Sequence, residues 1–290
     1  MLKKSKIVNV LIVYEKKNEK KKMKKKSIFK NFFSFSPIEN QKTLSINKTI
    51  DVLAKKIYYL TDIPTKPVCI TSDFEIDLLI KKLESTENLK DVVLLPLYPQ
   101  FSYEITGNLA NLFYQRLPES LFRKCLWIKS FSQNMGFINS WQKKIQESLN
   151  TLMWKEEDTI FIFFPKNISQ IKKEYLFHYE CHLAKRKILK KFPYALGHLI
   201  KLGEVINYIN TLTDNRKNIL FIPVSNLFDE EIPFQEINEL FISLQKRGFT
   251  SSLCLPLNLN SEWIHSICNI LEEGNVTNGY MLLPPKNPIE

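Results

Sequence analysis

Glycine is scarce in this chain, with 7 residues among 290, and the motifs that depend on glycine are missing. The sequence contains no Gly-x-Gly-x-x-Gly, no Walker A motif and no Gly-x-Ser-x-Gly. Such loops bring backbone amides close to phosphates, or expose a nucleophilic serine at a sharp turn. Their absence leaves the usual nucleotide-binding and hydrolase functions without support.

Long apolar runs are also absent. No run approaches the roughly 18–20 residues that a membrane-spanning helix needs. The N-terminal apolar stretch Ile7–Tyr14 has no small-residue cleavage site after it, so we predict a cytoplasmic protein without a signal peptide. The 5 cysteines are widely spaced and form no Cys-x-x-Cys pair, which predicts neither a zinc knuckle nor a disulfide framework.

The net charge of +11 is concentrated in one segment of the chain. Residues 1–30 hold 12 Lys and 2 Glu, whereas the remaining 260 residues hold 29 basic and 28 acidic side chains. That distribution does not suit a DNA-binding face, so we expect no nucleic-acid partner. We interpret Lys16–Lys26 as a solvated loop, with weak attraction to an anionic membrane surface as the alternative.

Short apolar runs alternate with longer amphipathic segments along the chain. The runs, each about as long as a buried parallel strand, are Ile7–Tyr14, Val68–Ser72, Val92–Pro96, Cys125–Ile128, Thr159–Phe164, Asn218–Pro223 and Ser252–Leu255. The segments with helical spacing are Thr49–Leu60, Phe74–Leu83, Asn108–Leu117, Phe137–Leu149, Glu180–Lys191, Phe234–Arg247 and Ser261–Glu272. This alternation predicts an α/β fold of two parallel-sheet domains, residues 1–150 and 151–290.

The most distinctive stretch is Val92–Gly107, which reads VVLLPLYPQFSYEITG. It resembles the signature of the ferrochelatase family, whose usual form is LPLYPQYS followed shortly by TTG. A second block, Asn218–Phe249, resembles the family segment that contains SDHIETLYEID, with matches at Pro223, Asp229 and Glu236. The blocks occur in the family's order and spacing over nearly the whole chain, and they resemble those of members from intracellular bacteria such as chlamydiae.

The resemblance implies a fold of two Rossmann-like domains of the class II chelatase type. It also implies an activity: insertion of ferrous iron into a porphyrin held between the domains, in haem biosynthesis. Porphyrin and ferrous iron would be substrates, and no tightly bound cofactor is expected. The chain lacks a C-terminal cysteine-rich extension, so we expect no iron–sulfur cluster. Such chemistry needs an aromatic-lined site, a base for two pyrrole protons, and ligands that deliver the metal.

The chain departs from the family at both positions that carry this chemistry. Lys166 occupies the position of the family's catalytic His, and Ile232 occupies that of its essential Glu. A lysine side chain is ordinarily a cation that repels iron, and isoleucine can neither relay a proton nor bind a metal. A shift of one residue before Pro233 would move Glu231 into the carboxylate position.

The resemblance assigns the remaining site residues by position. The catalytic set would comprise Lys166, Ile232, Glu236, Glu230 and Asp229, and the metal set Glu230, Glu231 and Glu236. The porphyrin-binding set would comprise Tyr14, Tyr98, Pro99, Gln100, Phe101 and Ser102, with loop packing as the alternative for the aromatic members.

The histidines are not assigned to the site. His178 and His182 are four residues apart and would share a helix face, but without a third ligand we interpret the spacing as coincidence. His198 and His265 are interpreted as surface or packing residues. Two hypotheses stay open for the chain: a divergent ferrochelatase whose site is rebuilt from nearby glutamates, and a non-catalytic or degenerate relative that binds porphyrin or haem.

Overall fold

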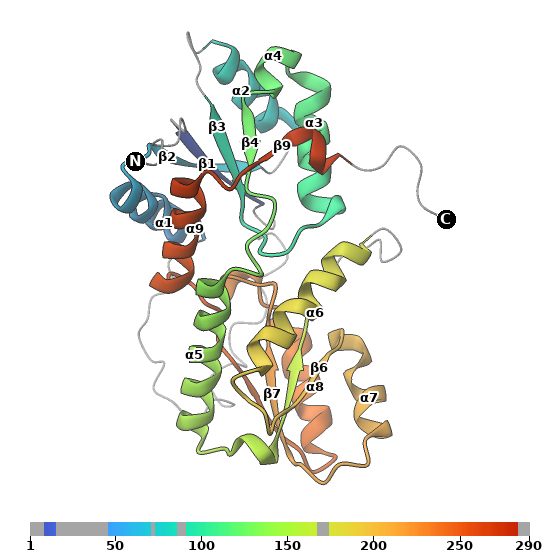
Figure 1. Cartoon of the computed structure of the whole chain (residues 1–290). Helices are drawn as coiled ribbons and strands as arrows, with labels where there is room; N and C mark the ends of the chain where they lie inside the picture. Colours follow the sequence, from blue (N-terminus) through green and yellow to red (C-terminus); the bar gives the residue numbers. More distant parts are fainter. Residues whose placement is uncertain (1–8, 16–45, 71–72, 86–90, 167–173, 284–290) are drawn as a thin grey trace.

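The computed structural model describes residues 9–15, 46–70, 73–85, 91–166 and 174–283. It contains two sheets flanked by helices, one above the other in Figure 1. Residues Lys16–Lys26 lie outside the described part of the chain, so the predicted solvated loop and its alternative, weak contact with a membrane surface, both stay predictions. No helix in the described part of the chain has the length and apolarity that crossing a membrane requires.

The first sheet has the strand order β2-β1-β3-β4-β9. Its strands are β1 (Asn9–Glu15), β2 (Thr65–Ile70), β3 (Val92–Pro96), β4 (Cys125–Trp127) and β9 (Thr277–Asn278). Neighbouring strands are parallel except β9, which pairs antiparallel with β4. The helices of this part are α1 (Ile46–Thr61), α2 (Asp73–Glu84), α3 (Asn108–Arg116) and α4 (Glu119–Phe122), and a π-helix, η3 (Tyr103–Gly107), precedes α3.

The second sheet has the order β6-β5-β7-β8 and is parallel throughout. Its strands are β5 (Thr159–Phe163), β6 (Leu196–Leu199), β7 (Asn218–Ile222) and β8 (Thr250–Leu253). The helices are α6 (Tyr175–Leu189), α7 (Val205–Thr211) and α8 (Phe234–Gln245). The central strands β5 and β7 are almost entirely buried, as expected for apolar runs covered by helices on both faces.

Two long helices join the two halves. Helix α5 (Met135–Leu152) leads from the first sheet to the second, and α9 (Ser261–Glu273) returns and packs against α5 and α1 (Figure 1). A β-carbon on Gly136 would lie 2.5 Å from the Glu262 carbonyl oxygen, so glycine is needed where α5 and α9 meet. The strands up to β4 precede residue 150, those from β5 to β8 follow it, and β9 rejoins the first sheet.

The predicted strands and helices agree with the structure to within a few residues, apart from the start of α6, and the α/β class is confirmed. Strand β6, helix α7 and the short β9 were not predicted. Strand β6 reads Leu-Gly-His-Leu, is half-buried and lies at the edge of its sheet. Such a strand has too few β-branched residues to stand out from a loop in the sequence alone.

Candidate active site

The carboxyl ends of strands from both sheets meet where the two halves face each other. Tyr98 follows β3 and Lys166 follows β5, and the Lys166 ammonium lies 4.4 Å from the centre of the Tyr98 ring. The Lys166 backbone N–H donates to the Ser225 hydroxyl, beyond the end of β7, over 2.8 Å. Ligands of open α/β sheets bind at the carboxyl ends of the strands, so this is the expected place for a site.

Lys166 also forms an ion pair with Glu231. Its ammonium lies 3.5 Å from one Glu231 carboxylate oxygen, and the two side chains are 16% and 13% exposed. The other carboxylate oxygen accepts the backbone N–H groups of Leu227 and Phe228 over 2.7 and 3.2 Å. Lys166, which we predict to stand at the family's histidine position, is therefore held by Glu231, one residue before the predicted position of the family's glutamate.

Ile232, which we predict to stand at the position of the family's glutamate, is a core residue. It is 6% exposed and belongs to the apolar cluster beneath α8, together with Ile237 and Phe164. Its side chain therefore contributes packing, and no carboxylate is present at this position. Glu231, next to it, is the carboxylate that reaches Lys166.

Two other acidic residues of this segment, Asp229 and Glu236, have different surroundings. Asp229 pairs with Asn258, which donates to it over 3.2 Å, and Glu236 is exposed in the first turn of α8. The Glu230 side chain lies outside the described part. Among the described residues, no group of three or more His, Cys, Asp or Glu is arranged to hold a metal ion. The predicted set of Glu230, Glu231 and Glu236 stays a prediction.

The signature loop after β3 is buried at the junction of the two halves. Pro99 is buried, Tyr98 is 9% exposed, and Gln100, Phe101 and Ser102 are each at most 1% exposed. The Gln100 amide donates to the Val224 carbonyl of the second half over 3.1 Å. These five predicted porphyrin-binding residues thus lie together, while the side chain of the sixth, Tyr14, is outside the described part.

Sequence reasoning missed Glu174, a buried glutamate that holds the end of the signature loop. Its carboxylate accepts the Ser102 hydroxyl over 3.0 Å and the Tyr103 backbone N–H over 3.2 Å, and it also accepts the Glu104 N–H. Burial raises the pKa of this carboxyl, while those three hydrogen bonds oppose the rise. The carboxylate therefore fastens the start of η3 to the helix α6 of the second half.

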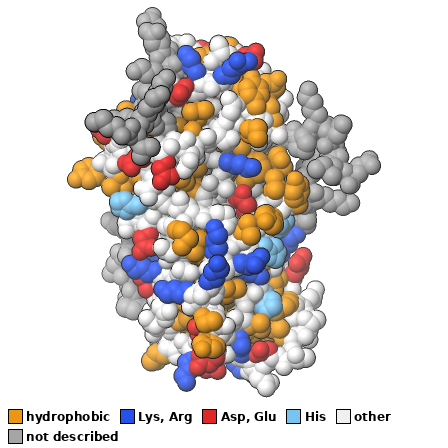
Figure 2. Space-filling model, in the orientation of Figure 1, with side chains coloured by type: hydrophobic (Ala, Val, Ile, Leu, Met, Phe, Trp, Pro, Cys, Tyr) orange, Lys and Arg blue, Asp and Glu red, His pale blue; other side chains and the backbone are white. Residues whose placement is uncertain are grey.

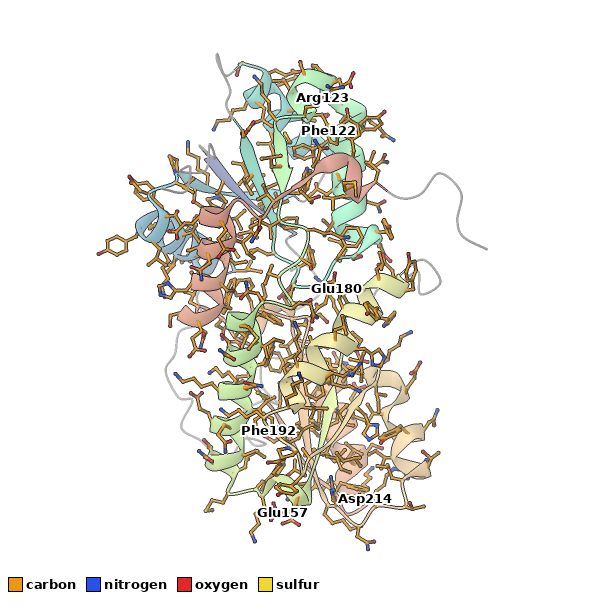
Figure 3. The ribbon with its side chains drawn as sticks, in the orientation of Figure 1. Phe122, Arg123, Glu157, Glu180, Phe192 and Asp214 are labelled. Atoms are coloured by element: carbon orange, nitrogen blue, oxygen red, sulfur yellow. The ribbon has the colours of Figure 1, made fainter. Side chains whose placement is uncertain are left out.

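Glu180, labelled on α6 in Figure 3, lies six residues after Glu174. It holds the same loop at Phe101. Its carboxylate accepts the Phe101 backbone N–H over 3.0 Å and the Ser132 hydroxyl over 3.1 Å. Burial raises the pKa of the Glu180 carboxyl as well. No local pattern marks either glutamate, because their partners lie 48 to 79 residues away in the sequence.

The histidines of the second half lie on α6 and β6. His178 and His182 are on α6, and His198 on β6 packs against Tyr208 with ring centres 4.7 Å apart. Burial lowers the pKa of all three, and neighbouring lysines lower it further. The fourth, His265, is exposed on α9.

The fold is that of the chelatases. The solved structure of SirB from Bacillus subtilis with Fe³⁺ matches with a TM-score of 0.58 and 8% identity, over 92% of this chain and 97% of SirB. The structure of CbiX, described as the terminal enzyme of siroheme biosynthesis in denitrifying bacteria, matches with a TM-score of 0.56 and 12% identity, over 90% and 96% of the two chains. Two mostly parallel sheets flanked by helices thus define the class II chelatase architecture here.

Within that class, the sequence specifies the family. The ferrochelatase family model matches residues 3–274, and the chain belongs to the ferrochelatase family. A ferrochelatase of Chlamydia trachomatis serovar A is 22% identical over 195 residues, which are 64% of this chain and 61% of that protein. A ferrochelatase of Aquifex aeolicus is 26% identical over 208 residues, 64% of each chain. The chain thus spans less than two thirds of the length of these relatives.

Proposed function

We propose that this protein is a metal chelatase that takes a tetrapyrrole between its two halves and inserts ferrous iron into a porphyrin with low turnover. Family membership supports the reaction, which would place the protein in haem biosynthesis. The observation that carries the low turnover is the contact of Lys166 with both Glu231 and Tyr98. An aromatic ring beside a charged pair, at the carboxyl ends of β3 and β5, suits a flat ligand with an ionisable centre.

Insertion requires that two pyrrole protons leave as the metal enters. A neutral imidazole can accept a proton and bind a metal near neutral pH. An ammonium already carries its proton and repels a divalent cation. Because the Lys166 ammonium also occupies one Glu231 oxygen, that carboxylate is only partly available as a proton acceptor or metal ligand. Loss of a positioned acid–base group typically costs about 10²–10⁴-fold in rate.

A second candidate function is tetrapyrrole binding without insertion. It is favoured by Ile232, which fills the family's glutamate position with a buried apolar side chain. Binding would need only the loop after β3 and the face it forms with the second half. Insertion would need Glu231 to act in place of the missing carboxylate.

The deciding experiment follows metalloporphyrin absorbance when zinc or ferrous iron is added to porphyrin and purified protein. Wild type is compared with Lys166→His, which restores the imidazole beside Glu231, and with Lys190→His, which adds a histidine at an exposed position beyond α6. Slow insertion by wild type and faster insertion by Lys166→His alone support the proposal. A Soret shift without insertion by any form supports the binding function instead, and no shift at all contradicts both.

A further inference from the structure

The loops that follow β7 and β8 leave the second sheet at the same edge. The two strands are parallel, with Phe221 opposite Leu253, and the Cys254 N–H donates to the Phe221 carbonyl over 2.8 Å. The loop after β7 carries Glu231, and the loop after β8 carries Asn258. The parallel pairing therefore brings the second loop next to the segment that holds the Glu231 carboxylate.

Asn258 makes three hydrogen bonds to that segment. Its backbone N–H donates to the Leu227 carbonyl over 2.7 Å. Its side-chain amide accepts the Asp229 N–H over 3.3 Å and donates to the Asp229 carboxylate over 3.2 Å. Leu227 and Phe228 in turn donate their N–H groups to the Glu231 carboxylate. Asn258 thus holds the residues on both sides of Phe228, and with them the two N–H groups that hold Glu231.

Asn258 is itself fixed by a contact from the other half of the protein. Its φ is 47°, in the left-handed region that asparagine tolerates better than most residues other than glycine. The indole N–H of Trp263, a fully buried residue of α9, donates to the Asn258 carbonyl over 2.9 Å. The Trp263 ring stacks on Phe131 with ring centres 6.0 Å apart, and the Phe131 N–H donates to the Pro99 carbonyl over 2.9 Å. Trp263 therefore connects Asn258 to the signature loop.

The hydrogen bonds that hold Glu231 are shielded from water. Leu227 is fully buried, Phe228 is 1% exposed, and the Glu231 side chain is 13% exposed. By contrast, Figure 2 shows blue and red side chains scattered over both halves of the face it draws, where water and salt screen them. A polar network in the interior is stronger than one at the surface, so the position of Glu231 depends on these few contacts.

We infer that Asn258 is a positioning residue, which acts through the loop after β7 to hold the Glu231 carboxylate against Lys166. This inference rests on the proposed function, in which Glu231 is the carboxylate that accepts a proton or binds the entering metal. A carboxylate that moves away from its place would meet the proton or the metal at the wrong distance. A displacement of about 1 Å in a positioned group can cost about 10²-fold in rate.

The test compares wild type with Asn258→Gly, which removes the side-chain amide and still permits a positive φ. Zinc insertion into a dicarboxylate porphyrin is followed by metalloporphyrin absorbance, and porphyrin affinity is measured by a Soret titration. We expect kcat to fall about tenfold, while Kd stays as in wild type because the loop after β3 is unchanged. Hydrogen exchange should become faster at the Leu227 and Phe228 amides. It should be unchanged at the Phe101 amide, which donates to Glu180.

A swap of the two polar groups tests the hydrogen bond between Asn258 and Asp229. Asn258→Asp keeps an acceptor for the Asp229 N–H but sets two carboxylates against each other, so hydrogen exchange at Leu227 and Phe228 should become faster. The further change Asp229→Asn restores one amide and one carboxylate in reversed places and should return that exchange toward the wild-type rate. The matched control is Asn275→Gly, at an exposed asparagine beyond α9, which should change neither insertion nor exchange.

Several results would overturn the inference while the proposed function stands. They are wild-type exchange at Leu227 and Phe228 in Asn258→Gly, an unchanged kcat despite faster exchange, and a failure of the swap to restore slow exchange. Weaker porphyrin binding together with faster exchange at Phe101 would indicate general loosening and would also overturn it. If wild type inserts no zinc, the proposed function fails and the role in insertion fails with it. The exchange rates then still decide whether Asn258 holds Glu231.

Discussion

The Lys166 ammonium lies 3.5 Å from a Glu231 carboxylate oxygen, at the position where the sequence resemblance predicts the ferrochelatase family's catalytic histidine. On that prediction, a cation and its counter-ion stand where the family has a base and its partner. Its two side chains are mostly buried, so the interaction is screened less than a surface ion pair would be.

We expect Lys166 and Glu231 to be energetically coupled. Lys166→Met removes the ammonium from Glu231, and Glu231→Gln removes the carboxylate charge beside Lys166. A double-mutant cycle on the free energy of unfolding should give a coupling of about 1 kcal/mol or more. A cycle with Lys144 and Glu147, a more exposed pair on α5 whose side chains are 30% and 53% exposed and 3.8 Å apart, should give no more than about 0.5 kcal/mol. Equal coupling energies for the two pairs would contradict the expectation that burial strengthens the Lys166–Glu231 ion pair.

Ile232→Glu should destabilise the protein instead of restoring the family's chemistry. The side chain is 6% exposed within the cluster beneath α8, and a carboxylate there would lack a partner. We expect a loss of about 3–5 kcal/mol in the free energy of unfolding near neutral pH, measured by urea denaturation. Ile232→Val, which keeps the site apolar, should cost about 0.5–1.5 kcal/mol. A soluble Ile232→Glu variant with wild-type stability would show that this position can reach solvent.

Removal of the Glu180 carboxylate should loosen the signature loop. Glu180→Ala leaves the Phe101 N–H and the Ser132 hydroxyl without their acceptor, and both residues are buried. The expected cost is about 1–3 kcal/mol, with faster hydrogen exchange at the Phe101 amide. Glu147→Ala on α5 is the control. It should not reproduce this loss of stability, and it should leave hydrogen exchange at the Phe101 amide unchanged. Unchanged exchange at Phe101 in Glu180→Ala would mean that other contacts hold the loop.

The pH dependence of stability should carry a contribution from Glu174. Burial raises the pKa of this carboxyl in the folded state, so the native protein binds the proton more tightly than the unfolded chain does. That contribution is fully present below the unfolded pKa of about 4.3 and is lost as the pH rises through the folded pKa. The Glu174→Gln variant has no carboxyl group at this position, so it lacks this contribution.

The measurement is the free energy of unfolding of wild type and of Glu174→Gln at a series of pH values. The stability of wild type relative to the variant should decrease as the pH rises from about 4. His178, His182 and His198 have lowered pKa values and act in the opposite direction, but they are common to both proteins and cancel in the difference. A difference that stays constant with pH would contradict the raised pKa of Glu174.

Most of the fold could be predicted because its strands are continuous apolar runs. The runs that became β3, β5 and β7 are long enough and sufficiently β-branched or aromatic to be recognised without neighbours. Strand β6 could not be recognised, because a short edge strand with Gly197 and His198 has the composition of a loop. Strand β9 has only two residues and exists because β4 offers an edge after α9 has returned to the first half.

The sequence by itself determined the α/β class and the family, and it predicted the two substituted positions, since each depends on local residue types and their order. It also placed Tyr98 through Ser102 in one loop. Only the tertiary structure decided that Glu231, and not Ile232, faces Lys166, and that Glu174 and Glu180 hold that loop. These contacts join segments many residues apart, and they arise because parallel strands bring their carboxyl ends to one edge. A carboxylate's role there depends on burial and on which donors surround it, and a residue's position in the sequence fixes neither.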